Sequence, residues 1–194
     1  MVNSSKSDAA NARLRDVWQE LCRSRGIVPT RQAAMWNELV ERHAETWRHY
    51  HTLAHVEALV ATLVQHEESQ QSPAQVLMAA FFHDAIYDPR ATDNEAQNAD
   101  LAADFLMETE IEEAFVVFVR DLILATAGHM NKVVAGDVIW FLDADLQILG
   151  ATSADYDNYA NASRPLGDSA KLSGCAAGLS NIDDARETGK SCAK

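Results

Sequence analysis

The chain has 194 residues, of which 47% are hydrophobic, and it carries a formal net charge of −13. This length suits one ordinary domain with a sizeable core, and the negative charge disfavours nucleic acid polymers and anionic membrane surfaces as partners, because like charges repel. No apolar run approaches the roughly 20 residues of a membrane span and no signal-peptide pattern opens the chain, so we expect a cytoplasmic protein with no membrane partner.

Apolar residues recur at helical spacing along most of the chain, and no sustained two-residue alternation marks a strand, so we predict an all-α fold. The first helix is expected to be capped by Asp8 and to stop near Gly26, and Thr30 can cap the second. Steps of three and four between apolar residues predict an amphipathic helix over residues 53–64. The next predicted helix covers residues 73–87 and has proline in its first turn.

Four more helices are predicted in the second half of the chain. Thr92 and Glu95 form a capping-box pattern at the start of one. Residues 111–127 are mostly apolar, and the length of this run favours a core helix over a buried strand. Residues 137–150 form a strong helical pattern that ends in glycine, and residues 153–163 can supply a last helix.

The composition changes near residue 163. Residues 164–194 hold four of the eight glycines and no aromatic residue. We therefore expect one helical domain over residues 1–163, followed by an atypical, poorly ordered tail. The three cysteines form no CxxC pair, so we expect free thiols at Cys22, Cys175 and Cys192.

Several charged side chains are predicted to point into the core. On a helix, the neighbours of His83 and of Asp145 at three and four positions are largely apolar, so both should face inward. Asp143 has a more mixed setting, and Asp84 sits beside the same face as His83. A single inward histidine is more often a satisfied core residue, but a group of buried imidazoles and carboxylates becomes stable when a divalent cation binds it.

A second histidine pair stands in "YHTLAH", where His51 and His55 are four residues apart at a predicted helix start. This spacing can hold a metal, or place one histidine on a metal and the other beside it. Taken alone, the pair could equally be part of a solvated first turn. Together with His83, Asp84 and Asp145, it predicts a metal site.

With these residues assembled, the chain resembles the HD superfamily of metal-dependent phosphohydrolases, and within it the small stand-alone predicted metal-dependent HD phosphohydrolase family. The resemblance covers roughly residues 10–160, in the family's order. The matching stretches are "RHYHTLAHVEALV", "AAFFHDAIYDP", "DNEAQNADLAADFL", "LATAGH" and "FLDADLQILGA". The resemblance implies an HD-domain helical bundle and hydrolysis of a small phosphate ester such as a nucleotide.

The same resemblance implies a ligand set of His55, His83, Asp84 and Asp145. Mixed nitrogen and oxygen ligands suit a divalent transition metal (Mn, Fe, Co, Ni or Zn), and the sequence does not choose among these. "YHTLAH" is also similar to the YHxxxH element of cyclic-nucleotide phosphodiesterases, which would make His51 a general acid. Asp84 would orient or deprotonate the attacking water.

Further residues have both a functional and an ordinary interpretation. Arg48 could bind phosphate or be a surface arginine. Asp88 could hold a water at the metal or form a helix exit before proline. His129 could line the pocket or bind a second metal, or it could complement a helix dipole. Lys132 is a weaker candidate cation, and Glu95 is better explained by its capping box.

Two alternative functions stay open. A di-iron HD oxygenase would use His129 and further ligands to hold two irons, and a helical binding or regulatory domain would keep a structural metal without turnover. The chain also departs from the family, whose members continue with a helical, aromatic-containing segment where this chain has residues 164–194. A reading-frame change in the source gene would explain this tail, a hypothesis that sequencing an independent isolate tests. The sequence predicts neither the substrate nor the oligomeric state.

Overall fold

Seven α-helices and two short 3-10 helices build the described part of the chain, and it contains no strand, which confirms the all-α prediction. The structure is a computed structural model, and it describes residues 2–48, 50–107, 109–128 and 136–147. All of these belong to one compact unit, Met1–Ala162. The predicted helix over residues 153–163, the predicted tail and the thiols Cys175 and Cys192 lie outside the described residues.

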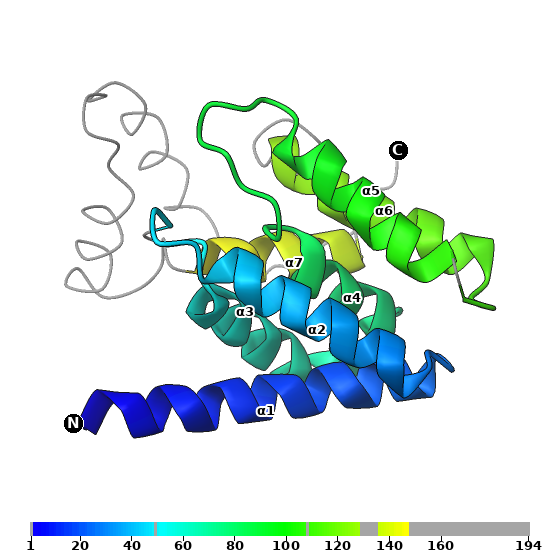
Figure 1. Cartoon of the computed structure of the whole chain (residues 1–194). Helices are drawn as coiled ribbons and strands as arrows, with labels where there is room; N and C mark the ends of the chain where they lie inside the picture. The colour runs from blue at the N-terminus through cyan, green and yellow to red at the C-terminus, as the bar shows by residue number, and fades with distance from the viewer. Residues whose placement is uncertain (1, 49, 108, 129–135, 148–194) are drawn as a thin grey trace, which may run out of the picture. The chain divides into compact units, whose positions relative to one another are not determined.

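The α-helices follow the chain in a simple order (Figure 1). Their bounds are α1 Val2–Ser24, α2 Pro29–His43, α3 Leu53–Gln65, α4 Pro73–Phe82, α5 Asn94–Met107, α6 Glu113–Ala125 and α7 Asp137–Asp145, and the 3-10 helices are Glu67–Ser69 and Thr126–Gly128. Within the described ranges, no helix is both long and apolar enough to span a bilayer.

Helix α4 lies at the centre of this arrangement. It packs against α1, α3, α5, α6 and α7, and α5 and α6 lie side by side (Figure 1). Six of its ten residues are buried, and they occupy all sides of the helix. They are Val76, Met78, Ala79, Ala80, Phe81 and Phe82. A helix that is apolar all round can only be a core element, so the residues at its end are held in a fixed place.

Trp18 of α1 anchors the aromatic part of the core and is fully buried. Its ring meets the ring of Phe81 edge-on at 5.1 Å and lies 5.5 Å from that of Phe105, while its indole N–H donates to the carbonyl of Gln32 at 3.0 Å. One side chain thus joins α1, α2, α4 and α5, and its polar atom is satisfied. Cys22 is buried nearby in sequence as a free thiol, as predicted.

Helices α4 and α7 run in the same direction because both of their ends are tied together. At the start, the buried carboxylate of Asp137 accepts hydrogen bonds from the backbone N–H groups of Gln71 and Ser72, at 2.7 and 2.6 Å, just before α4. At the other end, Asp145 lies 3.3 Å from His83. The two helices have nearly equal lengths, so this register places the last residue of α7 beside the end of α4.

Several predicted helix ends differ from the structure. Helix α1 includes Asp8, and α2 begins at Pro29 with Val28 as its cap, so neither Asp8 nor Thr30 is the N-cap. Proline at the first position explains the earlier start of α2, since its missing N–H needs no partner there. Helix α5 begins at Asn94 and the carbonyl of Asp93 accepts its first hydrogen bond, so Asp93 and not Thr92 precedes the helix and the expected capping box is not its start. Gly26 does stop α1, with a φ of +72°.

The largest difference concerns the helix predicted over residues 73–87, which ends at Phe82. The chain leaves the helix at His83, because side chains from other parts of the fold bind the carbonyl groups that a longer helix would use. This early end turns two adjacent residues, His83 and Asp84, toward the same point.

Candidate metal centre

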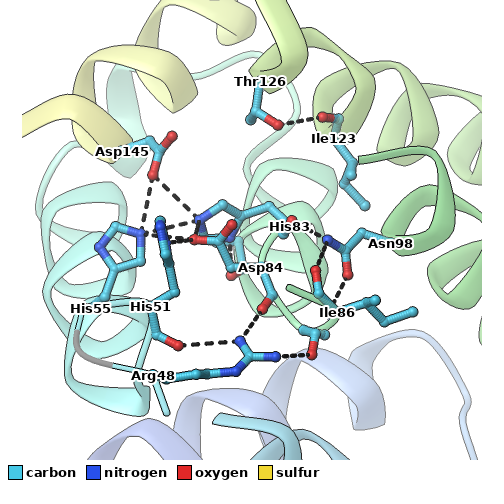
Figure 2. A network of polar contacts seen from close by, with 12 residues as sticks. Arg48, His51, His55, His83, Asp84, Ile86, Asn98, Ile123, Thr126 and Asp145 are labelled. Atoms are coloured by element: carbon cyan, nitrogen blue, oxygen red, sulfur yellow. Dashed lines mark hydrogen bonds and ion pairs between the residues drawn. The ribbon is translucent and has the colours of Figure 1, made fainter. Parts of the chain in front are cut away.

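Four side chains from three elements converge beside the end of α4 (Figure 2). His55 comes from the first turn of α3, His83 and Asp84 follow α4, and Asp145 is the last residue of α7. One ligand atom of each residue lies within 4.8 Å of those of the other three. These are the four residues predicted as metal ligands. Among the residues described here, they form the one cluster of this kind.

The spacing of the ligand atoms is close. Nε2 of His55 lies 3.1 Å from Nε2 of His83, 3.1 Å from Oδ1 of Asp145 and 3.5 Å from Oδ2 of Asp84. Nε2 of His83 lies 3.0 Å from Oδ2 of Asp84 and 3.3 Å from Oδ1 of Asp145. Both imidazoles are almost completely buried, and the two carboxylates are partly accessible.

This spacing fits a transition-metal ion. With bonds of about 2.1 Å, two ligands at a right angle lie about 3.0 Å apart and two at a tetrahedral angle about 3.4 Å apart. The five distances run from 3.0 to 3.5 Å. Nδ1–H of His83 donates to the carbonyl of Ala80 at 3.0 Å, which leaves its Nε2 directed at the cluster, as in a metal-ligating histidine. The donor set therefore fits a divalent cation.

The charges of the cluster support each other when no metal is bound. Burial by itself would lower the pKa of His83, but the nearby carboxylates of Asp84 and Asp145 outweigh it, and the pKa lies well above the usual value. Burial would raise the pKa of Asp84, yet the positive charge of His83 and the hydrogen bond from His51 hold it well below the usual value. In the metal-free protein, the positive charge of protonated His83 therefore balances the negative charge of the neighbouring carboxylates.

His51 lies next to the cluster without belonging to it. Its Nδ1 is 2.7 Å from Oδ2 of Asp84, and its side chain keeps 28% of its surface exposed. Because the Asp84 carboxylate is ionised, Nδ1 carries the hydrogen and donates it, which leaves Nε2 as the atom that exchanges protons. The ring also contacts Tyr87, with ring centroids 4.3 Å apart. The general-acid role of His51 stays a prediction.

Arg48 is buried under the turn that carries the ligands (Figure 2). Its guanidinium donates to the carbonyls of His51, Asp84 and Ala85, at 3.2, 2.6 and 2.8 Å, and pairs with Glu45 at 2.8 Å. These bonds hold the segment before α3 against the segment after α4. The expectation that Arg48 meets a phosphate is not supported by these contacts, which make it a positioning residue instead.

Asn98 of α5 binds the same turn from the other side, and it is 1% exposed. Its amide N–H groups donate to the carbonyls of His83 and Ile86, at 2.6 and 2.9 Å, and its carbonyl accepts from the N–H of Ile86 at 2.6 Å. Together Arg48 and Asn98 satisfy all four carbonyls from His83 to Ile86, which explains why α4 ends where it does. Sequence reasoning missed Asn98, because its helical neighbours Asn94 and Glu95 are polar and give no sign that it is buried.

The remaining candidates lie elsewhere. Asp88 is exposed, and its carboxylate accepts from the N–H of Arg90 at 2.8 Å, so it shapes a turn and makes no contact with the cluster. Because α4 ends at Phe82, Asp88 is not a helix exit before proline, and its role in holding a water at the metal stays a prediction. Glu95 lies in the first turn of α5. His129 and Lys132 lie outside the described residues.

Comparisons of the chain with protein-family models, with curated proteins and with solved structures found no match. The resemblance to the HD superfamily therefore stays a prediction that rests on the sequence motifs.

Proposed function

We propose that the chain is a metal-dependent phosphohydrolase of the HD type that cleaves a small phosphate ester. The observation that carries this proposal is the convergence of His55, His83, Asp84 and Asp145 with a fifth residue, His51, hydrogen-bonded to one of the four. Two nitrogen and two oxygen donors suit the divalent ions from Mn²⁺ to Zn²⁺.

When bound, a divalent cation withdraws electron density from a phosphoryl oxygen and lowers the pKa of water. Asp84 stays ionised, so its carboxylate can orient the attacking water and accept a proton from it. As the bond between phosphorus and the ester oxygen breaks, His51 donates the proton from Nε2 to the leaving oxygen. The products are an alcohol and inorganic phosphate.

The position of His51 favours an enzyme over a structural metal site. A closed structural site needs four ligands and gains nothing from a fifth, partly exposed histidine bonded to one of them. A di-iron centre would need a second group of ligands that includes His129, which lies outside the described residues, whereas the ligands of a single-metal site are all described. We therefore retain the single-metal hydrolase as the proposed function.

The test measures phosphate release from a panel of phosphate monoesters. We expect activity in the protein as purified, loss of activity after treatment with a chelator, and recovery when Mn²⁺ or another divalent transition metal is added back. A metal-loaded protein that releases no phosphate from any of these esters would contradict the proposal and favour the binding domain.

A further inference from the structure

The orientation of the His51 ring depends on more than its hydrogen bond to Asp84. That bond holds one ring atom, Nδ1, and the side chain keeps 28% of its surface exposed. Because the torsion that turns a histidine ring has broad energy minima, a bond at one atom does not set the plane of the ring. Nε2, the atom proposed to donate the proton, can then turn away from the leaving oxygen. The plane of the ring therefore depends on what packs against it.

The ring of Tyr87 packs against this imidazole. The two ring centroids are 4.3 Å apart, and the ring planes are tilted by 46°. Tyr50 also contacts the imidazole, edge-on at 5.2 Å, but it contacts the ligand His55 as well, at 4.8 Å. Tyr87 lies three residues after Asp84 in the segment that follows α4, so one short stretch of chain supplies both the hydrogen-bond acceptor and the packed ring. The hydrogen bond and the ring contact together define the position of the imidazole.

Tyr87 is itself held in place by Trp47 and Arg48. Its ring stacks on that of Trp47, with centroids 5.9 Å apart and planes 17° apart. The guanidinium of Arg48 lies 5.9 Å from the Tyr87 centroid and 5.3 Å from the Trp47 centroid. The Arg48 side chain is almost completely buried, and it donates to the carbonyls of His51 and Asp84 (Figure 2). One fixed guanidinium thus supports the backbone at both ends of the hydrogen bond and the two rings beside it.

We propose that Tyr87 is the positioning residue of His51, whose ring plane it fixes so that Nε2 faces the leaving oxygen of the ester. This inference rests on the proposed function, because it gives the ring contact a consequence for proton donation. Tyr87 is partly buried and Trp47 is 44% exposed, so the two rings lie at the edge of the fold and outside its core. Replacing either ring should therefore affect His51 more than it affects the stability of the fold.

The first experiment observes His51 by NMR in the chelator-treated full-length protein, so it needs neither metal nor turnover. An aromatic ring at 4.3 Å shifts the signals of the imidazole, which are assigned by their absence in His51→Gln. Tyr87→Leu should remove this shift and lower the order parameter of the His51 ring, whereas Tyr87→Phe should retain both. The matched control is Trp140→Leu, because Trp140 stacks on His66 at 5.2 Å. It should change the signals of His66 and leave those of His51 in place.

The second experiment measures hydrolysis by the metal-loaded protein. Tyr87→Leu should lower kcat for glycerol 3-phosphate about tenfold and leave KM and metal content near the parent values, because a misplaced acid slows the reaction without weakening binding. The loss with p-nitrophenyl phosphate should be less than about twofold, because its leaving group departs without a proton. Tyr87→Phe should recover most of the activity. Trp47→Leu should cause a smaller loss with the same preference between the two esters.

A combined variant tests whether Tyr87 acts through His51. In the His51→Gln protein, Tyr87→Leu should cause no further loss of kcat for glycerol 3-phosphate, because the group that Tyr87 positions is already absent. Trp140→Leu should leave kcat for both esters within about twofold of the parent.

The outcomes separate this inference from the proposed function. Unchanged His51 signals in Tyr87→Leu would overturn the inference and leave the hydrolase standing. Equal losses of kcat with the two esters, or a further loss in the His51→Gln protein, would overturn it as well, because both indicate a general structural effect. Changed His51 signals together with no hydrolysis of either ester by the parent would contradict the hydrolase, and the role of Tyr87 in proton donation would be overturned with it.

Discussion

His51 donates a hydrogen bond of 2.7 Å from Nδ1 to Oδ2 of Asp84, the same carboxylate oxygen that lies 3.0 Å from Nε2 of His83. One carboxylate thus connects the proposed proton donor with the proposed metal site. The bond fixes the His51 ring and leaves its Nε2 as the atom that exchanges protons. The proposed role of His51 follows from this pair.

Replacing His51 by glutamine should reduce kcat by about 10²- to 10⁴-fold for an alkyl phosphate, as expected when a general acid is lost. The loss should be much smaller for p-nitrophenyl phosphate, because its leaving group departs without a proton. Steady-state assays with both substrates, together with metal analysis, check this. The matched control is His66→Gln, a partly buried histidine at the end of α3 away from the cluster. An equal loss with both substrates would argue against the acid role.

Replacing Asn98 by leucine should destabilise the fold and weaken metal binding. The carbonyls of His83 and Ile86 and the N–H of Ile86 lose their partner, and each unsatisfied buried group costs about 1–3 kcal/mol. Metal affinity should fall about 10- to 100-fold, as for other groups that hold ligands in place. Denaturant unfolding and competition with a metal indicator measure both effects. Unchanged affinity in a folded variant would show that the turn needs no support from α5.

Two substitutions of Arg48 should weaken metal binding to different degrees, because Arg48 supports the same turn as Asn98. Lysine keeps the charge but cannot reach three carbonyls with a planar fork, so Arg48→Lys should retain part of the metal affinity and Arg48→Met should retain less. If Arg48 were instead a phosphate ligand, both variants would raise KM and leave metal affinity unchanged. Parallel metal and kinetic titrations distinguish the two.

Metal binding should depend on pH because a proton and the cation compete for His83. Its raised pKa means that binding near neutral pH releases a proton, so affinity should rise with pH up to that pKa.

The folding stability of the metal-free protein should instead decrease as pH rises. Its stabilisation by protonated His83 is complete below pH 6.5, the usual pKa, and is lost as pH rises through the raised one. Proton release during metal titration, and unfolding of the metal-free protein against pH, test both signs.

A separate pH effect should come from His43, which is 3% exposed. Its Nδ1–H donates to the carbonyl of Leu39 at 2.8 Å, its Nε2 is buried and has no hydrogen-bond partner in the described structure, and burial lowers its pKa to about 4. The unfolded chain therefore binds this proton first, and stability falls as pH drops from 6.5 to 4, by about 3 kcal/mol in total. His43→Leu should reduce this acid sensitivity. An identical pH slope of the unfolding free energy in both proteins would contradict it.

Helical periodicity predicted that His83 and Asp145 face inward, and the resemblance to the HD superfamily implied the full ligand set. The structure buries His83, leaves Asp145 partly accessible and exposes Asp143, so the preference for Asp145 over Asp143 is confirmed. Helix type was predictable from the same periodicity. The ends of helices were harder to predict. The end of α4, for example, depends on Arg48 and Asn98, which come from distant parts of the chain.

The roles of Arg48 and Asp137 could not be predicted from local pattern. Each role depends on a partner that tertiary packing supplies, such as the N–H groups that Asp137 binds before α4. An arginine in sequence is as compatible with binding carbonyls as with binding phosphate, and only the fold decides which groups it meets.

The most direct test of the metal centre is elemental analysis of the purified protein beside Asp145→Ala and Asp143→Ala, prepared without added metal or chelator. Asp143 is a matched control, since it is an exposed carboxylate on the same helix. We expect close to one equivalent of a transition metal in the parent and in Asp143→Ala, and little in a folded Asp145→Ala. Equal metal content in all three proteins, or none in the parent even after supplementation, would contradict the metal centre.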